Sequence, residues 1–243
     1  MKQVSEEILE SRSLWFRYKT LVWLQESPQR DVVHNTMRLL RSIRFRELAY
    51  VSVPITSGKF FYKLQLAHPR ATRDELMTAS INHNYQVGWE FAENLQKHRN
   101  CPILYPADLV PAHQQWEQDH FQALWLSIIG EFCTEIHMCE GWEFSNGGRE
   151  EFAHVMQLRL GLPSHPKLIF FNTKNSEEAE RKRMKTIMVY DHRGNAISLQ
   201  DGVKLIEGAR AWMKNRCLNG AKFENSLDLL HWTDSMIQQG FYQ

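Results

Sequence analysis

The sequence lacks several features that would point to particular classes of protein. Its four cysteines form no Cys-X-X-Cys pair and match no zinc-site spacing, so we interpret them as small apolar residues in a reducing compartment. The 29 basic and 28 acidic residues nearly cancel, which argues against a protein that coats long nucleic acids. No apolar run approaches the roughly 20 residues of a membrane span, and the acidic start does not resemble a signal peptide. We therefore expect a cytoplasmic protein without a metal, a cofactor or a membrane partner.

What the sequence does contain is an alternation of short apolar runs with amphipathic segments, from about residue 48 to residue 215. The runs are short and rich in β-branched and aromatic residues, as in buried parallel strands. They span residues 49–53, 102–105, 135–139, 167–171 and 186–190. Between most of them, apolar residues recur at helical spacing. This order predicts an α/β fold, Rossmann-like or flavodoxin-like, with a parallel sheet of about five strands and helices on both faces.

The flanking segments also show helical spacing. Residues 1–47 predict an N-terminal helical extension that is interrupted at Pro28, and Asp31 is the expected N-cap of its second helix. The apolar face of that helix comprises Val33, Met37, Leu40 and Ile43. Residues 216–243 predict a C-terminal helical tail, which leaves residues 48–215 as the α/β domain. We expect the extension to pack on this domain or on a second subunit.

Three loops fall at the carboxyl ends of predicted strands, where open sheets of this type bind ligands. They span residues 54–59, 106–111 and 141–148. The third loop places a serine and two glycines, Ser145, Gly147 and Gly148, directly before a helix predicted over residues 147–160. The free N–H groups at a helix start attract anions, and glycine lets a ligand approach the backbone closely. This loop is therefore a candidate anion site.

Two carboxylates, Glu150 and Glu151, follow in the first turn of the same predicted helix. Acids at that position stabilise a helix through its dipole without any further role. The pattern alone therefore leaves a purely structural interpretation open.

Four motifs in order resemble the superfamily of nucleoside 2-deoxyribosyltransferases and 2′-deoxynucleoside 5′-monophosphate N-glycosidases, in particular its small bacterial and phage branch. They read "YVSVPITSG", "NHNYQVGWEFAENLQKHRNCPILYPADLV", "WEQDHFQALW" and "CEGWEFSNGGREE". The resemblance covers residues 48–172. Its most specific part is the spacing of Gly141, Trp142, Ser145, Gly147, Gly148 and Glu151. The fold that it implies agrees with the strand and helix pattern.

The resemblance also implies roles for individual residues. Glu151 is the carboxylate that attacks the anomeric carbon of deoxyribose, and Asp119 is the second carboxylate, which assists protonation of the leaving base. Ser145 and the loop after the first strand hold the 5′-phosphate or 5′-hydroxyl. The candidate substrate-binding residues of the two loops are Ile55, Ser57, Gly58, Gly147 and Gly148. Trp142 is the best candidate to stack on the base, and sites shared between subunits imply a homodimer or larger assembly.

The sequence departs from the family pattern at two places. Thr134 stands where relatives have an aspartate, and residues 59–79 look like an insertion that could form a lid over the pocket. Two other functions therefore stay open: a nucleotide-binding module without catalysis, which Thr134 favours, and an NAD-cleaving glycohydrolase. The base, the need for a 5′-phosphate, and the choice between hydrolysis and transfer stay open too.

Overall fold

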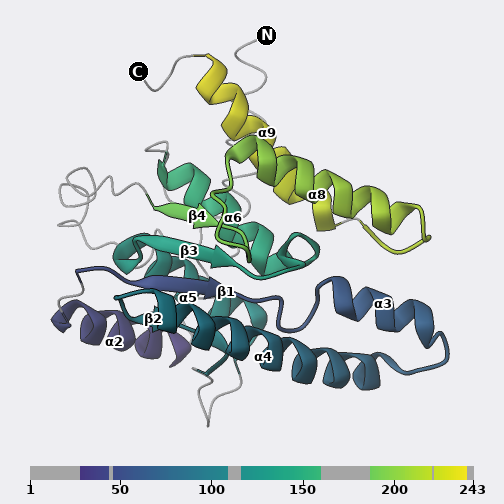
Figure 1. Cartoon of the computed structure of the whole chain (residues 1–243), viewed down its shortest axis with the longest axis horizontal. Helices are drawn as coiled ribbons and strands as arrows, with labels where there is room; N and C mark the ends of the chain where they lie inside the picture. The colour runs from purple at the N-terminus through teal and green to yellow at the C-terminus, as the bar shows by residue number, and fades with distance from the viewer. Residues whose placement is uncertain (1–27, 44–45, 109–115, 160–186, 221, 240–243) are drawn as a thin grey trace.

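The structure is a computed structural model that describes residues 28–43, 46–108, 116–159, 187–220 and 222–239 (Figure 1). Within this part of the chain lies a parallel sheet in the order β2-β1-β3-β4. The strands are β1 (Ala49–Ser52), β2 (Ile103–Leu104), β3 (Glu135–Met138) and β4 (Met188–Tyr190). The α/β class and the parallel sheet are thus confirmed, with four strands in the described residues. The strand predicted over residues 167–171 lies outside them.

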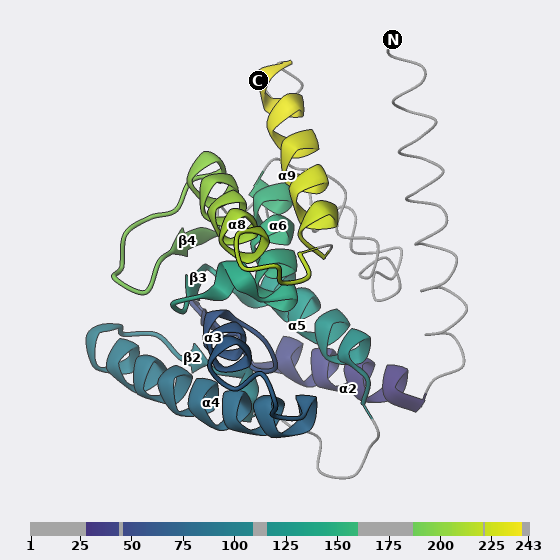
Figure 2. The same ribbon diagram turned by 90° about the vertical axis from the view of Figure 1, so that its right-hand side faces the viewer.

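Helices cover both faces of this sheet (Figure 2). One face carries α4 (Arg73–His98), and the other carries α5 (Gln118–Phe132) and α6 (Asn146–Arg159). Successive residues of a strand point to opposite faces. Tyr50 of β1 accordingly belongs to the large core cluster on the α5 and α6 side, whereas Val51 belongs to a smaller cluster beneath α4. Both faces of β1 are buried, which explains its continuous apolar run.

Helix α2 (Pro28–Ser42) packs against α5. It begins at Pro28, so Asp31 lies inside the first turn and the prediction of an N-cap there is wrong. Proline suits a first turn because the N–H that it lacks would have no helical partner there. Val33 and Met37 are buried in the large core cluster. The second helix of the predicted extension therefore packs on the α/β domain, as one of the two expected arrangements.

Two helices connect β1 to β2, namely α3 (Lys59–Ala67) and α4. Helix α4 begins at Arg73, inside the segment that the sequence suggested was an insertion. The reason is a capping box: the Thr72 hydroxyl accepts a hydrogen bond from the Glu75 N–H at 3.3 Å, and the Glu75 carboxylate accepts one from the Thr72 N–H at 2.8 Å. Residues 59–79 are thus α3, a turn and the first residues of α4.

The chain continues from β4 into α8 (Leu199–Lys214) and α9 (Lys222–Gln238). Both helices pack against α6, and Phe223, Leu227 and Leu230 of α9 belong to the same core cluster as the sheet. Gly202 lets α8 approach α6 closely, because a Cβ there would lie 2.0 Å from the ring of Phe152. Two 3-10 turns, η1 (Pro106–Asp108) and η2 (Trp142–Phe144), follow β2 and β3. No helix of the described residues is long and apolar enough to cross a membrane.

Candidate active site

The edge of the sheet where the strands end, here called the carboxyl edge, carries the loop between β3 and α6. Gly141 has a φ of 82°, a left-handed conformation that glycine adopts without strain, and η2 follows it. The Ser145 hydroxyl then accepts a hydrogen bond from the Gly148 N–H at 3.4 Å, which caps α6. The predicted order of strand, loop and helix is therefore confirmed, with α6 beginning at Asn146, one residue earlier than expected.

Glu151 lies in the second turn of α6 and not in the first turn as predicted, and it is buried and fixed by two hydroxyl groups. It is 6% exposed. The Tyr50 hydroxyl donates to its Oε1 at 2.8 Å, and the Ser52 hydroxyl donates to its Oε2 at 2.5 Å. Tyr50 and Ser52 are two positions apart on β1, so their side chains share the face that α6 covers. Each carboxylate oxygen thus has its own donor, and the group has a defined orientation.

Burial of the carboxyl group raises the pKa of Glu151 to about 7, although the hydrogen bonds from Ser52 and Tyr50 act in the opposite direction. The pKa of Tyr50 is raised well above its ordinary value by burial and by the neighbouring Glu151. A carboxyl group with a pKa near 7 interconverts between its acid and its base at neutral pH. Groups of this kind are common among catalytic acids, bases and nucleophiles.

The preceding residue, Glu150, has a different environment. Its Oε1 accepts a hydrogen bond from the Asn146 side-chain amide at 2.9 Å, one turn back on α6. Adjacent helical side chains diverge by about 100°, which explains why the two carboxylates have separate partners. The geometry therefore distinguishes Glu151 from Glu150, as the sequence motif did.

Arg149 is a buried cation next to both glutamates that the sequence analysis did not single out. Its guanidinium donates to the Glu143 carbonyl at 3.1 Å and to the Asn146 side-chain oxygen at 3.4 Å. It also lies over the ring of Phe223 in α9, 4.0 Å from the centroid. Burial lowers its pKa to about 10. Arg149 thus ties the loop after β3 to the C-terminal helix.

The two glycines at the start of α6 are in tight surroundings. A Cβ on Gly148 would lie 2.9 Å from the Trp142 carbonyl oxygen, and one on Gly147 would lie 3.2 Å from Oε1 of Gln122. The Gln122 amide reaches the Gly147 carbonyl at 3.5 Å, so the first part of α5 meets the start of α6. Asp119 lies in the first turn of α5, but its side chain is not among those that the structure describes. The expected pairing of Asp119 with Glu151 therefore stays a prediction.

Trp142 was the candidate for stacking on a base, and the structure places it in the core. The residue is 3% exposed, and its ring packs against Phe152 with 4.9 Å between centroids. Burial against Phe152 accounts for the aromatic residue without a binding role, and the stacking of Trp142 on a base stays a prediction.

The loop of residues 54–58, which follows β1, contains the half-buried Ile55 and Ser57 and the buried Gly58. Gly58 has a φ of 123°, and a Cβ there would lie 2.7 Å from Cβ of Pro54. Asn84 of α4 donates to backbone carbonyls of this loop. Asn84 was not among the residues predicted for the site. The signal that could have found it is an asparagine in the middle of a helix, where its intrinsic propensity is poor.

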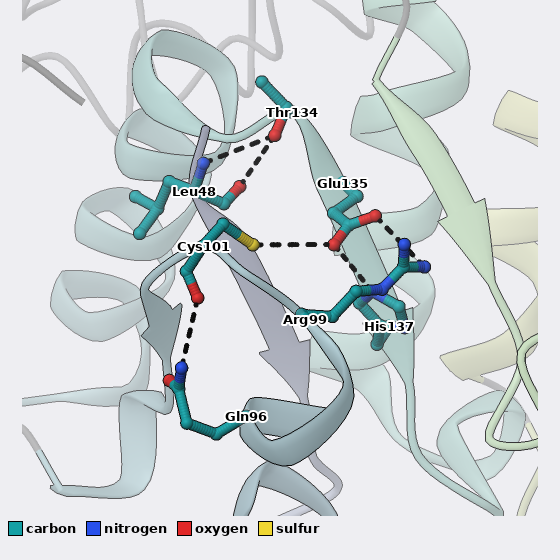
Figure 3. Close-up of polar contacts among 7 residues, drawn as sticks. All are labelled: Leu48, Gln96, Arg99, Cys101, Thr134, Glu135 and His137. Carbon is teal, nitrogen blue, oxygen red and sulfur yellow. Dashed lines mark hydrogen bonds and ion pairs between the residues drawn. The ribbon is translucent and has the colours of Figure 1, made fainter. Parts of the chain in front are cut away.

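The opposite edge of the sheet, here called the amino edge, carries a second polar cluster (Figure 3). Glu135 of β3 lies 3.4 Å from Nη2 of Arg99, 3.3 Å from Nε2 of His137 and 3.9 Å from Sγ of Cys101. A pocket of about 630 Å³ opens beside this cluster. It is lined by Arg46, Glu47, His98, Arg99, Asn100, Cys101, Thr134 and Glu135. The described residues contain no group of three potential ligands arranged for a metal ion.

Thr134, which replaces the family aspartate, belongs to this amino edge. Its hydroxyl accepts from the Leu48 N–H and donates to the Leu48 carbonyl, both at 3.3 Å (Figure 3). It therefore joins β3 to β1 at the beginning of both strands. Because Glu151 meets Ser52 at the last residue of β1, the departure at Thr134 does not touch the carboxyl edge.

No protein-family model matches this chain, and neither does any curated protein or any solved structure. The resemblance in the motifs is thus neither supported nor opposed by known proteins. What sets the carboxyl edge apart is the chemistry of its own side chains: a buried carboxyl group with a pKa near 7, held by two hydroxyls, between two loops that contain glycine.

Proposed function

We propose that this protein cleaves the N-glycosidic bond of a deoxynucleoside or of its 5′-monophosphate, with Glu151 as the nucleophile. The observation that carries the proposal is the orientation of one buried carboxylate by Tyr50 and Ser52 at the carboxyl edge. Carboxylates are the usual nucleophiles at anomeric carbons. In addition, open parallel sheets bind their ligands at this edge.

The proposed reaction has two steps. A Glu151 oxygen bonds to C1′ while the C1′–N bond breaks, and the electron pair of that bond leaves with the base. The base takes up a proton, which the resemblance assigns to Asp119. Water or a second base then bonds to C1′, gives up a proton to the Asp119 carboxylate, and displaces the Glu151 oxygen, which regenerates the Glu151 carboxylate. Tyr50 and Ser52 hold the carboxylate in one orientation throughout, which reduces the entropy lost on reaching the transition state.

The binding of the sugar's 5′ end is proposed for the loop of residues 54–58 and for Ser145. Both belong to the carboxyl edge, since they follow β1 and β3, which are neighbours in the sheet. Ser145 is buried, and its hydroxyl oxygen already accepts a hydrogen bond from the Gly148 N–H. The hydroxyl hydrogen can still be donated to a substrate oxygen.

A nucleotide-binding module without catalysis is the second candidate. One observation favours it: both oxygens of Glu151 are engaged within the protein, as they would be in a carboxylate with a structural role. In that case the protein binds a nucleotide and releases no base.

The test is an assay for free base with a panel of substrates. The panel contains the deoxynucleosides, their 5′-monophosphates and NAD, and the variants are Glu151→Gln and the matched control Glu150→Gln. We expect base release from a deoxynucleoside or its monophosphate, a loss of about a thousandfold or more in Glu151→Gln, and a change within about threefold in Glu150→Gln, which faces Asn146.

Equal losses in both variants, or full activity of Glu151→Gln, would contradict the assignment. Release of nicotinamide from NAD alone would identify an NAD-cleaving enzyme. Calorimetric binding of a nucleotide with no base release from any substrate would identify the binding module.

A further inference from the structure

The side chain of Asn84, in α4, holds the loop of residues 54–58 through hydrogen bonds to its backbone. Asn84 of α4 is 6% exposed. Its amide nitrogen donates to the carbonyls of Pro54, Ile55 and Ser57, the last two at 3.2 Å, and contacts Oγ of Ser80 at 3.1 Å. The amide has two hydrogens, so these acceptors share them. One donor group therefore draws three carbonyls of the loop to the same side.

This arrangement also decides where the N–H groups of the loop point. In a planar trans peptide the C=O and the following N–H point in opposite directions, and the described residues contain no cis peptide. With three carbonyls turned toward Asn84, the N–H groups of Ile55, Thr56 and Gly58 point away from α4. The side of the sheet opposite α4 carries α6 (Figure 2), which is the helix that contains Glu151. Within the described part of the chain, these three N–H groups donate to no other residue.

We propose that Asn84 is the positioning residue of this loop, to which the resemblance already assigns the 5′ end of the sugar. By holding three carbonyls, Asn84 keeps three N–H groups turned toward the substrate side. A phosphate offers several acceptor oxygens to such a set of donors, whereas a 5′-hydroxyl offers a single oxygen. This inference rests on the proposed function for the identity of the sugar and base.

The conformation that Asn84 holds is also constrained from within the loop. Gly58 has a left-handed φ of 123° and packs against Pro54, which is where Asn84 donates. The packing of Gly58 on Pro54 and the Asn84 hydrogen bonds therefore constrain both ends of the loop. Losing the Asn84 donors removes the partner of the buried Pro54 carbonyl and of the part-buried Ile55 and Ser57 carbonyls, and the loop would then have to turn these groups toward water.

The test compares Asn84→Asp with Asn94→Asp. Asn84→Asp keeps the shape of the side chain but replaces the donor with a carboxylate that repels three carbonyl oxygens. Asn94 lies on the exposed surface of the same helix, so Asn94→Asp makes the same chemical change without the loop contacts. For Asn84→Asp we expect KM for a deoxynucleoside 5′-monophosphate to rise about tenfold or more. We expect kcat to stay within about threefold, and KM for the free nucleoside to change less. Asn94→Asp should leave every constant unchanged.

A second measurement does not depend on catalysis. In ¹⁵N-labelled protein, titration with a deoxynucleoside 5′-monophosphate should shift the amide signals of Ile55, Thr56 and Gly58, and Asn84→Ser, which keeps one donor, should weaken that shift. If these signals shift but no base is released, the inference about Asn84 stands and the catalytic proposal fails.

If base release depends on Glu151 but Asn84→Asp lowers kcat alone, or raises both KM values equally, the catalytic proposal stands and the inference fails. The inference would also be overturned if the amide signals of the wild-type protein did not respond to the monophosphate. This measurement decides the question even if Asn84→Asp does not fold.

Discussion

Glu151 and Glu135 are both buried beside the same sheet, but the kinds of group that hold them differ. Glu151, at the carboxyl edge, accepts hydrogen bonds from the neutral hydroxyls of Tyr50 and Ser52. Glu135, at the amino edge, lies within 3.4 Å of the guanidinium of Arg99 and of the imidazole of His137. A cation compensates the charge of a carboxylate, whereas a hydroxyl only solvates it.

The comparison shows how one sheet can carry a structural carboxylate and a chemically adaptable one. The hydroxyls around Glu151 do not compensate for burial, so its pKa reaches about 7. The imidazole beside Glu135 is itself affected by its surroundings, since burial lowers the pKa of His137 although the neighbouring Glu135 acts in the opposite direction. The difference between neutral and charged partners can be tested directly, by three changes of decreasing effect.

The largest expected effect is on the pH dependence of stability. The pKa of Glu151 is raised from 4.5 to about 7 in the folded protein. A group of this kind contributes stability that is fully present below pH 4.5 and is lost as the pH rises through about 7. The shift corresponds to about 3 kcal/mol. We therefore expect the free energy of unfolding of Glu151→Gln to rise by about this amount relative to wild type between pH 4 and pH 8, measured by urea denaturation.

The matched variant at the other edge is Glu135→Gln. It should lower stability at pH 7, because Arg99 loses the carboxylate beside it. A difference between wild type and Glu151→Gln that does not change with pH would show that Glu151 is not buried as described.

A smaller effect is expected from Tyr50→Phe. This change removes the hydroxyl that donates to Oε1 of Glu151 and that lowers the pKa of Glu151. The pKa of Glu151 should rise further, so the acid limb of the kcat/KM profile should move to higher pH, and stability at pH 7 should fall by about 1 to 2 kcal/mol. Tyr190→Phe is the control, since the Tyr190 ring stacks on His137 on the other face of the sheet. If the acid limb does not move in Tyr50→Phe, the ionisation that controls kcat/KM is not that of Glu151.

The smallest effect is expected on activity, for a change at the amino edge. Glu135 begins β3, whereas the Glu151 site lies where β1 and β3 end. Glu135→Gln should therefore change the rate of base release by less than about threefold at a temperature where the variant is folded. A loss as large as that of Glu151→Gln would place the active site in the pocket beside Arg99 and Cys101 instead.

The elements that were predicted well are those whose signal is local. The apolar runs at residues 49–53 and 135–139 became β1 and β3, and the glycine-containing loop before Glu151 opened a helix as expected. The start of α4 was not predicted, although its signal is also local, since Thr72 and Glu75 have the spacing of a capping box. Asp31 was wrongly taken as an N-cap because the alternative start at Pro28 was taken as a break.

The alternation of strands and helices and the position of Glu151 near the start of a helix could be predicted from local sequence, because hydrophobic period and capping depend on residues a few positions apart. Only the tertiary structure decided which groups meet Glu151. Tyr50 and Ser52 are about a hundred positions away along the chain, and the sheet brings them under α6. It likewise decided that Trp142 packs against Phe152 and that Asn84 holds the loop after β1. Burial and hydrogen bonding depend on where distant segments pack, and the pKa of a carboxyl group depends on both.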